Sequence, residues 1–351
     1  MSPGWQPVGD RSVRVGLAGL GSMGRNHLRV LAGRDDVRLA AVADPLQTAL
    51  AAATAQTGAQ GFAVPQAMIA EAELDAVVIA APTTAHVPLA LAAIERGMAV
   101  LVEKPLAASV DGALRVAAAA HASGVPVQVG HIERFNPAVL ELGRLIGEGW
   151  LSAVYSITSR RAGPFPARIR DVGVTVDLAT HDADIASWIA GERPTRVYGE
   201  TAQRIHATNE DLLFGLLQFP SGATGMLDVN WLTPAKRRQL VVVGEEGMFE
   251  LDYLTQRLTF TRANDTTNPR LIGGYAPVFE GEIVELPVAT TEPLAAEIDA
   301  FLRVVHEGGK PQVDVEDGLW AVAIATSLLA AAADGVAVDL TALGSRFARA
   351  S

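Results

Sequence analysis

The chain has 351 residues, 49% of them hydrophobic, so it can bury a sizeable interior and is too long for one ordinary core. A net charge of −11 without any basic run argues against nucleic-acid partners, and the lack of cysteine excludes disulfides and thiolate metal sites. The first twelve residues lack the apolar segment of a signal peptide, and the apolar run 319–333 is shorter than the roughly 18 residues of a membrane span. We therefore expect a soluble, cytoplasmic, two-domain protein without membrane partners, with a flexible tail over residues 1–12.

Residues 13–44 predict a strand, a glycine-rich turn, a helix and a second strand. In the turn, Gly19 permits a tight bend, Gly21 lets a pyrophosphate approach the backbone, and Gly24 lets helix and strand pack closely. The helix that follows offers N–H groups and partial positive charge to phosphates. Asp44 ends the second strand, at the distance typical of an acid that binds the hydroxyls of an adenosine ribose. The stretch predicts a dinucleotide-binding unit.

Further strands alternate with helices up to residue 129. Apolar runs predict buried strands at 76–81, 99–102 and 125–129, with helices between them at 46–55, 87–96 and 110–122. This alternation predicts a doubly wound parallel sheet, in which ligands bind beyond the carboxyl ends of the strands. The loops 82–86 and 103–105 follow such ends, so we expect them at the same edge as the glycine turn.

Beyond residue 130 the pattern favours strands. A connecting helix over 136–148 precedes strands predicted at 153–159, 195–201, 211–219, 223–228, 239–243 and 248–253. Turns at Gly222 and Gly247 predict antiparallel hairpins. Helices are predicted at 174–190, 294–306 and 315–333, the last with Asp314 as N-cap and Asp317 in its first turn, and 262–270 is predicted to be a polar loop.

Lys104 follows a buried strand at the predicted ligand edge. A lysine there can reach a substrate hydroxyl, and Pro105 restricts its backbone to an extended form. The alternative is a surface lysine in a loop. Its position at the ligand edge favours a functional role.

Asp177 and His181 are four residues apart on a predicted helix and so share one face. A histidine is suited to take a hydroxyl proton, and Asp177 could orient the ring or contact the substrate. A metal site that also uses Asp182 and Asp184 is disfavoured, because these two point to other faces of the helix. We therefore predict no metal. A purely structural Asp–His pair is the other alternative.

A third polar segment, 129–137, lies at the expected junction of the domains. His131, Arg134 and Asn136 there suit a substrate rim, with Arg134 pairing a carboxylate or phosphate. Helix capping by Asn136 and a salt bridge of Arg134 are the structural alternatives, and the same ambiguity applies to Arg160 and Arg161. Two further histidines, at positions 27 and 86, lie near the predicted cofactor edge.

Three segments carry a resemblance to the glucose–fructose oxidoreductase and inositol dehydrogenase family: GLGSMGRNH, APTTAHVPLALAAIERGMAVLVEKPLA and VDLATHDAD. The resemblance implies a Rossmann domain followed by an α/β domain with a large open, mostly antiparallel sheet. It also implies homodimers or homotetramers, and NAD(P)-dependent oxidation of a sugar, cyclitol or similar alcohol. Lys104 matches the family's E-K-P lysine, and Asp177 and His181 match its D-x-x-x-H pair, with His181 as the acid/base.

His131 departs from the phenylalanine or tyrosine that many members have after Val-Gly, and VGHIERFNP resembles the branch that oxidises the 3-hydroxyl of UDP-N-acetylglucosamine-type sugars or their uronates. An inositol, cyclitol or free-sugar dehydrogenase is the alternative within enzymes, and a non-catalytic NAD-binding sensor is the alternative from another class. Asp44, with no arginine beside it at 46–47, favours NAD over NADP.

The sequence thus predicts an NAD-dependent dehydrogenase of a sugar or nucleotide sugar. Its expected domains are a Rossmann domain over 13–130 and a substrate-binding and oligomerisation domain over 131–351, with the last helix packing back on the first domain. The expected catalytic residues are Lys104, Asp177 and His181, and these three join His131, Arg134 and Asn136 in binding substrate. The expected cofactor-binding residues are Gly19, Gly21, Met23, Gly24, Asp44, Pro82, Thr83, His86, Glu103 and Lys104.

Overall fold

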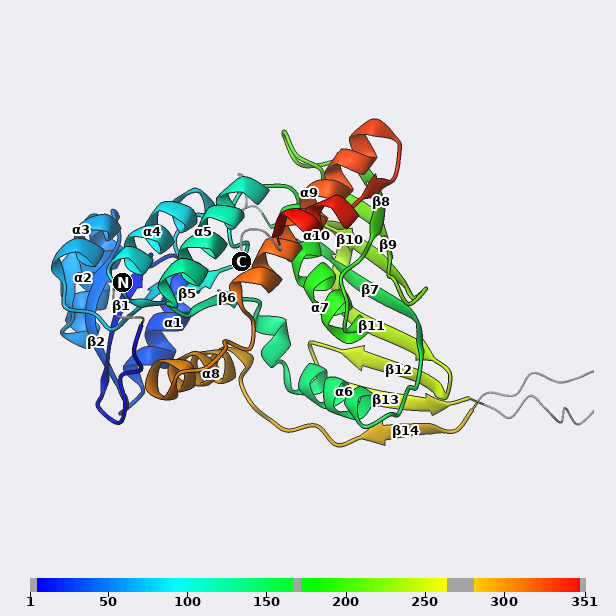
Figure 1. Cartoon of the computed structure of the whole chain (residues 1–351), viewed down its shortest axis with the longest axis horizontal. Coiled ribbons are helices and arrows are strands. Elements are labelled where there is room, and N and C mark those ends of the chain that lie inside the picture. The colour runs from blue at the N-terminus through cyan, green and yellow to red at the C-terminus, as the bar shows by residue number, and fades with distance from the viewer. Residues whose placement is uncertain (1–4, 167–171, 264–280, 348–351) are drawn as a thin grey trace, which may run out of the picture. The chain divides into compact units, whose positions relative to one another are not determined.

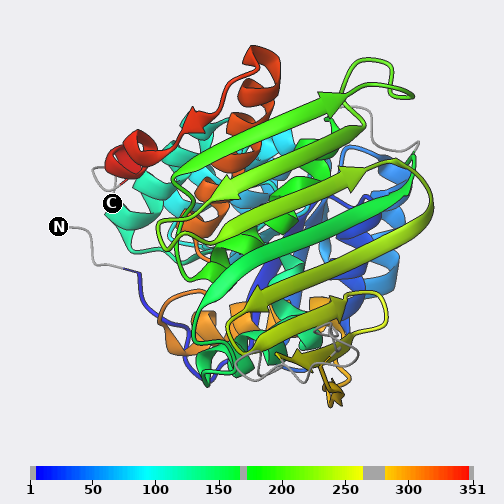
Figure 2. The same cartoon turned by 90° about the vertical axis from the view of Figure 1, so that its right-hand side faces the viewer.

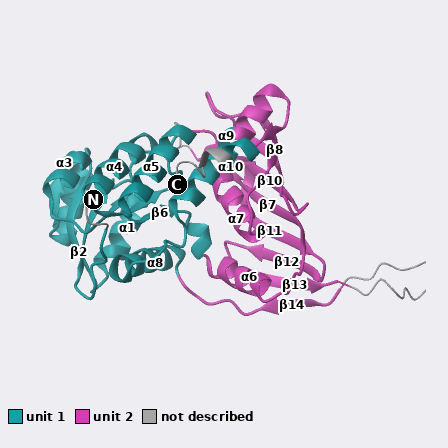
Figure 3. Cartoon of the chain, in the orientation of Figure 1, with its two compact units in different colours: residues 1–135, 292–326, 341–351 teal, residues 136–291, 327–340 magenta. Residues whose placement is uncertain are grey.

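The computed structural model describes residues 5–166, 172–263 and 281–347, which divide into two compact units (Figure 1, Figure 3). Unit 1 comprises residues 1–135, 292–326 and 341–351, and unit 2 comprises residues 136–291 and 327–340. The boundary predicted at 130–131 lies near the junction at 135–136, and unit 1 also includes residues 292–326 and 341–351, among them the start of the last long helix. Most of the predicted polar loop, residues 264–270, lies outside the described residues.

Unit 1 is built on a six-stranded parallel sheet with the strand order β3-β2-β1-β4-β5-β6, and the predicted doubly wound topology is confirmed. Its strands are β1 (Val13–Ala18), β2 (Val37–Ala43), β3 (Gln60–Phe62), β4 (Ala76–Ile79), β5 (Ala99–Glu103) and β6 (Val127–Gly130). The chain order reverses between β1 and β4. In such sheets the carboxyl ends at this switch point form the ligand crevice.

The helices of unit 1 cover both faces of this sheet, so its strands carry continuous apolar runs. They are α1 (Ser22–Ala32), α2 (Gln47–Thr57), α3 (Pro65–Glu71), α4 (Thr83–Glu95), α5 (Val110–Ser123), α8 (Pro293–Glu307), the first part of α9 (Val315–Asp334) and α10 (Thr341–Phe347). Helix α8 packs Leu294, Ile298 and Phe301 into one core cluster. The start of α9 packs Val315 and Leu319 into the other. This burial explains why both segments belong to unit 1.

Helix α9 is long and apolar enough to cross a membrane by length and composition, and 61% of that window is buried inside the protein. It begins as predicted, since Asp314 Oδ1 accepts the N–H of Asp317 at 2.9 Å and Asp317 Oδ2 accepts the N–H of Asp314 at 3.2 Å. This reciprocal cap satisfies two donors at the helix start. The buried share of α9 fits a helix that packs in the protein core.

Unit 2 is built on a nine-stranded sheet with the order β14-β13-β12-β11-β7-β10-β9-β8-β15 (Figure 2). All its neighbouring strands are antiparallel except β7 and β10, as expected for the second domain. Its strands are β7 (Val154–Pro164), β8 (Arg196–Ala202), β9 (Leu212–Gln218), β10 (Thr224–Asn230), β11 (Leu232–Gly244), β12 (Gly247–Asp252), β13 (Arg257–Arg262), β14 (Ile283–Leu286) and β15 (Val338–Asp339).

Helices α6 (Pro137–Gly147) and α7 (Thr180–Ala190) pack against strands of this sheet. The strands alternate between buried and exposed side chains, as in a sheet with one covered face. The uncovered face carries Phe214, Leu216 and Met226, which are 51%, 47% and 44% exposed. Leu216 and Met226 are direct cross-strand partners, so apolar side chains gather on β9 and β10.

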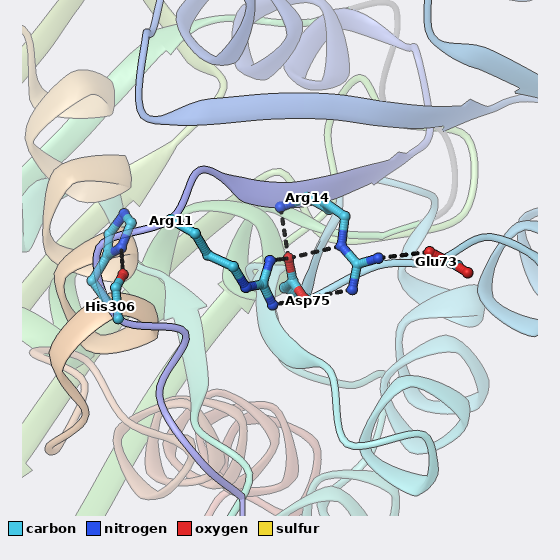
Figure 4. A network of polar contacts seen from close by, with 6 residues as sticks. Arg11, Arg14, Glu73, Asp75 and His306 are labelled. Carbon is cyan, nitrogen blue, oxygen red and sulfur yellow. Dashed lines mark hydrogen bonds and ion pairs between the residues drawn. The ribbon is translucent and has the colours of Figure 1, made fainter.

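At the amino end of β1, a polar network ties the start of the chain to the sheet (Figure 4). Arg11 and Arg14 both contact the Asp75 carboxylate, at 2.7 to 3.1 Å, and Arg14 also pairs with Glu73. Nearby, His306 Nδ1 lies 2.6 Å from the carbonyl oxygen of Gly9. These contacts lie at the end of the strands opposite to the glycine turn, so they stabilise unit 1 without approaching the ligand edge.

Candidate functional site: a dinucleotide turn and an acid–histidine segment

The glycine turn has the geometry that a dinucleotide requires. Gly19 has φ of +95°, and a Cβ there would stand 2.5 Å from the Ala80 carbonyl oxygen. A Cβ at Gly24 would stand 2.0 Å from the Gly19 oxygen, whereas a Cβ at Gly21 would meet nothing within 4 Å. The fold itself thus demands Gly19 and Gly24, while Gly21 leaves the N-terminus of α1 open to a ligand. Met23 lies in the first turn of this helix.

Asp44 is held at the end of β2 by backbone groups. Its Oδ2 accepts the N–H of Leu20 at 2.7 Å, and its Oδ1 accepts the N–H of Leu46 at 2.8 Å. These bonds fix the half-buried carboxylate beside the glycine turn, where an oxygen can accept further hydrogen bonds from a ribose. The glycine geometry and this anchored acid together fit the adenosine and pyrophosphate of NAD.

A groove of about 530 Å³ adjoins Leu20 and Leu46, and Arg25 and Arg29 of α1 contribute to its wall. The Arg25 guanidinium also lies within 3.4 Å of the Leu20 carbonyl oxygen. Along the chain, no arginine lies beside Asp44 at positions 46–47. In the fold, Arg25 and Arg29 of α1 line the same groove as Leu46. The spacing of these residues along the chain does not reveal that they lie together.

The loop after β4 is organised by His86. Pro82 caps α4, Thr83 begins it, and the buried His86 ring lies 2.8 Å from the Pro105 carbonyl oxygen and 2.9 Å from that of Ala81. Burial lowers the pKa of His86, although the hydrogen bonds to both carbonyls and the charge of Glu103 act to raise it. His86 therefore connects the two turns at the ligand edge, and both its ring nitrogens face the protein.

Lys104 follows β5 directly, as predicted, and the Lys104–Pro105 peptide is cis. Its neighbour Glu103 is nearly buried, and the Glu103 Oε1 lies 2.8 Å from Nε2 of the fully buried His27. His27, predicted to lie near the cofactor edge, thus contacts an acid in the interior. The residue before Lys104 is anchored from α1.

The rim segment after β6 is more buried than its sequence suggested. His131 is 1% exposed, and Arg134 is 3% exposed with its Nη2 at 3.4 Å from Asp317 Oδ1. In unit 2, the Asn136 side chain caps α6 by accepting the N–H of Ala138 and also donates to the Tyr253 carbonyl. The structural alternatives for Arg134 and Asn136, a salt bridge and a helix cap, are therefore realised in the fold.

Asp177 and His181 lie on one continuous helical segment of unit 2, but its first turn is not α-helical. Residues Thr175–Ala179 form a π-helical turn, and α7 continues from Thr180. The four-residue spacing predicts an ordinary α-helix, and the structure differs in the wider turn that carries Asp177. Wide turns of this kind are rare and occur often at functional sites. Glu210 fixes the start of the segment, because its Oε1 accepts the N–H of Thr175 at 3.0 Å.

Asp182 and Arg161 form a buried ion pair beside this segment. The Arg161 Nε lies 3.0 and 2.9 Å from the two Asp182 oxygens, and Ser159 Oγ donates to Oδ1 at 2.7 Å. The Arg161 guanidinium also stacks on Tyr253, 5.1 Å from the ring centroid. Asp182 is therefore committed to the interior of unit 2 rather than to a metal, and Arg160 pairs instead with Asp228 at the surface, at 3.0 Å.

Comparisons with known proteins agree with this architecture. Residues 13–131 match the model described as "Oxidoreductase family, NAD-binding Rossmann fold", and residues 139–250 match the GFO/IDH/MocA C-terminal domain. The inositol 2-dehydrogenase of Rhizobium meliloti is 30% identical over 341 residues, which cover 92% of this chain and 98% of that protein. Inositol 2-dehydrogenase 2 of Saccharopolyspora erythraea is 36% identical over 198 residues, and there the match spans only 55% of this chain and 58% of that protein.

One similar solved structure is the WlbA dehydrogenase of Bordetella pertussis in complex with NADH and UDP-GlcNAcA. It is 26% identical, with a TM-score of 0.78, and the match covers 94% of this chain and 99% of that one. The parallel sheet, the glycine turn and the anchored Asp44 define a dinucleotide-binding protein of the Rossmann class, and the matching family model makes it an oxidoreductase. More narrowly, the chain belongs to the GFO/IDH/MocA oxidoreductase family, and its cofactor is NAD. The resemblance found in its motifs is thereby confirmed.

Proposed function

We propose that the enzyme oxidises a secondary alcohol of a sugar or nucleotide sugar of the UDP-N-acetylglucosamine type. The observation that carries the proposal is that this family member has a lysine at the ligand edge of unit 1 and an acid–histidine pair on one helical segment of unit 2. A pure NAD sensor needs neither, which argues against the third alternative. The nucleotide sugar is favoured by the VGHIERFNP segment and by the UDP-GlcNAcA in a similar solved structure.

Each residue has a distinct role in this proposal. NAD, when bound, accepts the hydride. Lys104 holds the alcohol oxygen by charge and hydrogen bonding, and His181 takes the hydroxyl proton as general base. Asp177 supports His181 and the substrate. Gly19, Gly21, Met23, Gly24 and Asp44 hold the cofactor, with Pro82, Thr83, His86 and Glu103 shaping the loops at the same sheet edge.

The test replaces Lys104 and His181 separately by alanine. We expect kcat to fall about 10² to 10⁴-fold in each variant, with the Kd for NAD nearly unchanged. Lys310→Ala and His121→Ala are matched controls, since these side chains are 76% and 32% exposed and lie outside the proposed site. Full turnover in both test variants, followed at 340 nm, would show that the roles are wrongly assigned.

A cyclitol substrate is the second candidate, because an inositol dehydrogenase aligns along almost the whole chain. Thermal stabilisation discriminates the two, since a ligand that binds only the folded state raises Tm by mass action. We expect an additional shift with NAD plus UDP-N-acetylglucosamine or its uronate, compared with NAD alone. A shift with myo-inositol and none with the UDP-sugars would transfer the proposal to cyclitols.

The uncovered face of the large sheet supports a homodimer or homotetramer as the working form, and the enzyme is proposed to act in the cytoplasm. Phe214, Leu216 and Met226 place large apolar groups on this face, and such patches are typical of protein interfaces. Leu216→Glu should shift the elution volume and light-scattering mass toward the monomer. An unchanged mass would place the interface elsewhere.

A further inference from the structure

Three ionisable side chains meet in the interior of unit 1. His27 comes from α1, Glu103 from the end of β5 and Glu297 from α8, and one nitrogen or oxygen atom of each lies within 4.8 Å of the others. His27 and Glu297 are fully buried, and Glu103 is 8% exposed. None of these contacts follows from the proposed hydride-transfer chemistry, so the cluster needs an explanation of its own.

Buried polar atoms without a hydrogen-bond partner among the described residues lie around this cluster. Both carboxyl oxygens of Glu297 are buried without a hydrogen-bond partner among the described residues, and so are His27 Nδ1 and Gln128 Oε1. Gln128 lies beside Glu297, because its Nε2 donates to the backbone carbonyl oxygen of Glu297 at 3.0 Å. A buried carboxylate ion without any donor is strongly disfavoured, whereas a protonated carboxyl supplies one O–H donor.

We propose that Glu297 is kept as a neutral carboxylic acid and, together with His27, serves as a positioning residue for Glu103 and thereby for Lys104. The proton on Glu297 makes it a donor to an acceptor of the cluster. Glu103 then carries the negative charge, held by His27 on one side. The role assigned to Lys104 rests on the proposed function, but the protonation of Glu297 does not.

The electrostatics agree with this distribution of charge. Burial, followed by the charge of Glu103, raises the pKa of Glu297 well above its usual value. Burial also acts to raise the pKa of Glu103, but the hydrogen bond with His27 and the charges of His27 and Lys104 outweigh it and lower that pKa. When two carboxyl groups share one site, the proton stays on the one without a compensating partner.

The cluster connects α1 and β5, the two elements that carry the glycine turn and Lys104. Helix α1 begins at the glycine turn, and β5 ends at Lys104. A polar contact of 2.8 Å between His27 Nε2 and Glu103 Oε1 joins these two elements, and a carboxyl oxygen of Glu297 lies within 4.8 Å of both side chains. A Cβ at Gly130 would stand 3.1 Å from the Glu103 carboxyl, so this group is also confined from β6. Small displacements of Glu103 are therefore passed on to the adjacent lysine.

A divalent cation is the competing explanation for two buried acids and a histidine. However, the 2.8 Å between His27 Nε2 and Glu103 Oε1 is a hydrogen-bond distance. Two ligands at tetrahedral angles and about 2.1 Å from zinc would stand roughly 3.4 Å apart. The geometry therefore favours a hydrogen bond between His27 and Glu103 over a shared metal ion. Detection of a bound metal would overturn the proposal.

Infrared difference spectroscopy of the full-length enzyme tests the protonation directly. At about pH 8, where ordinary carboxyl groups are ionised, the wild type should show the carbonyl stretch of a protonated carboxyl. Glu297→Gln should lose this band, and Asp299→Asn, on the same helix but 48% exposed, should retain it. Absence of the band from the wild type, its persistence in Glu297→Gln, or stoichiometric metal removable by a chelator would overturn the proposal.

Steady-state kinetics test the positioning role. Glu297→Gln retains the neutral shape and a donor, so kcat and its pH profile should stay within about threefold of the wild type. Glu297→Leu removes the donor, and we expect kcat to fall about tenfold or more with little change in the Kd for NAD. Wild-type kcat and pH profile in a folded Glu297→Leu variant would overturn the positioning role. The infrared result does not depend on activity, so failure of the proposed function is distinguished from failure of this inference.

Discussion

The two units hold their polar groups by different means. In unit 1, the glycine turn and the loop after β4 are fixed by backbone groups: Asp44 accepts two N–H groups, and His86 lies against two carbonyls. In unit 2, the helix that carries His181 is fixed from its neighbour Asp182, which forms a buried ion pair with Arg161. Substitutions at the glycine turn and Asp44 should therefore lower the affinity for NAD without unfolding the protein. Substitution of Asp182 should instead destabilise the helical segment that carries His181.

The largest expected effect is on the buried ion pair. Asp182→Ala leaves the Arg161 guanidinium in the interior without its carboxylate, so the free energy of unfolding should fall by about 3–5 kcal/mol. Asp228→Ala breaks the neighbouring but exposed pair with Arg160 and should cost less than about 1 kcal/mol. Urea unfolding of both variants makes the measurement. Equal small losses in both variants would show that the buried ion pair does not stabilise the helix that carries His181.

The next effect concerns cofactor affinity. Asp44→Ala removes a charged acceptor for ribose hydroxyls, which is worth about 1.5–3 kcal/mol, so the Kd for NAD should rise roughly 10 to 100-fold. Binding of NADP should weaken less, because the mutation also removes repulsion of its 2′-phosphate, and Arg25→Ala is the variant expected to weaken NADP binding selectively. Calorimetric titration with both cofactors checks this. Unchanged NAD affinity would remove Asp44 from the site.

The smallest effect is an acid-dependent one at the opposite edge of unit 1. Burial acts to raise the pKa of Asp75, but the hydrogen bonds from Arg11 and Arg14 outweigh it and the pKa is lowered. A lowered folded-state pKa stabilises the protein above the unfolded value of about 3.9, and this contribution disappears as pH falls through the folded-state value.

Asp75→Asn should therefore destabilise the protein by about 1 kcal/mol at pH 7, since both arginines are partly exposed to solvent. The difference from the wild type should shrink as the pH is lowered below about 4. Chemical unfolding at a series of pH values provides the comparison, with Glu73→Gln as a control for the exposed partner of Arg14. A difference that grew on acidification would have the wrong sign.

Unit 1 could be predicted closely because its sheet is buried on both faces and leaves continuous apolar runs. The predicted strands at 13–18, 37–43, 76–81, 99–102 and 125–129 are all present within a few residues. In unit 2, β13, β14 and β15 were not predicted, and neither was the short edge strand β3 of unit 1, since short segments resemble loops without their sheet partners. The π-helical turn at Asp177 was also beyond prediction, because the pattern of residues there is the same for both kinds of helix.

Side-chain partners from distant segments were the other limit. No spacing rule connects Arg161 to Asp182 or His27 to Glu103, which meet only after strands and helices pack. Glu297 did leave a signal: it lies three residues after Leu294 and four before Phe301, on the apolar stripe of α8. A lone acid on such a stripe points to a buried carboxyl.

The central claim is that NAD and a sugar alcohol react on this chain through His181. The most direct measurement is absorbance growth at 340 nm with NAD and a panel of UDP-N-acetylglucosamine, its uronate, myo-inositol and free sugars, for the wild type and for His181→Ala. We predict growth with at least one substrate in the wild type and a rate about 10² to 10⁴-fold lower in the variant. A flat wild-type trace across the panel despite NAD binding, or equal rates in both proteins, would contradict the account.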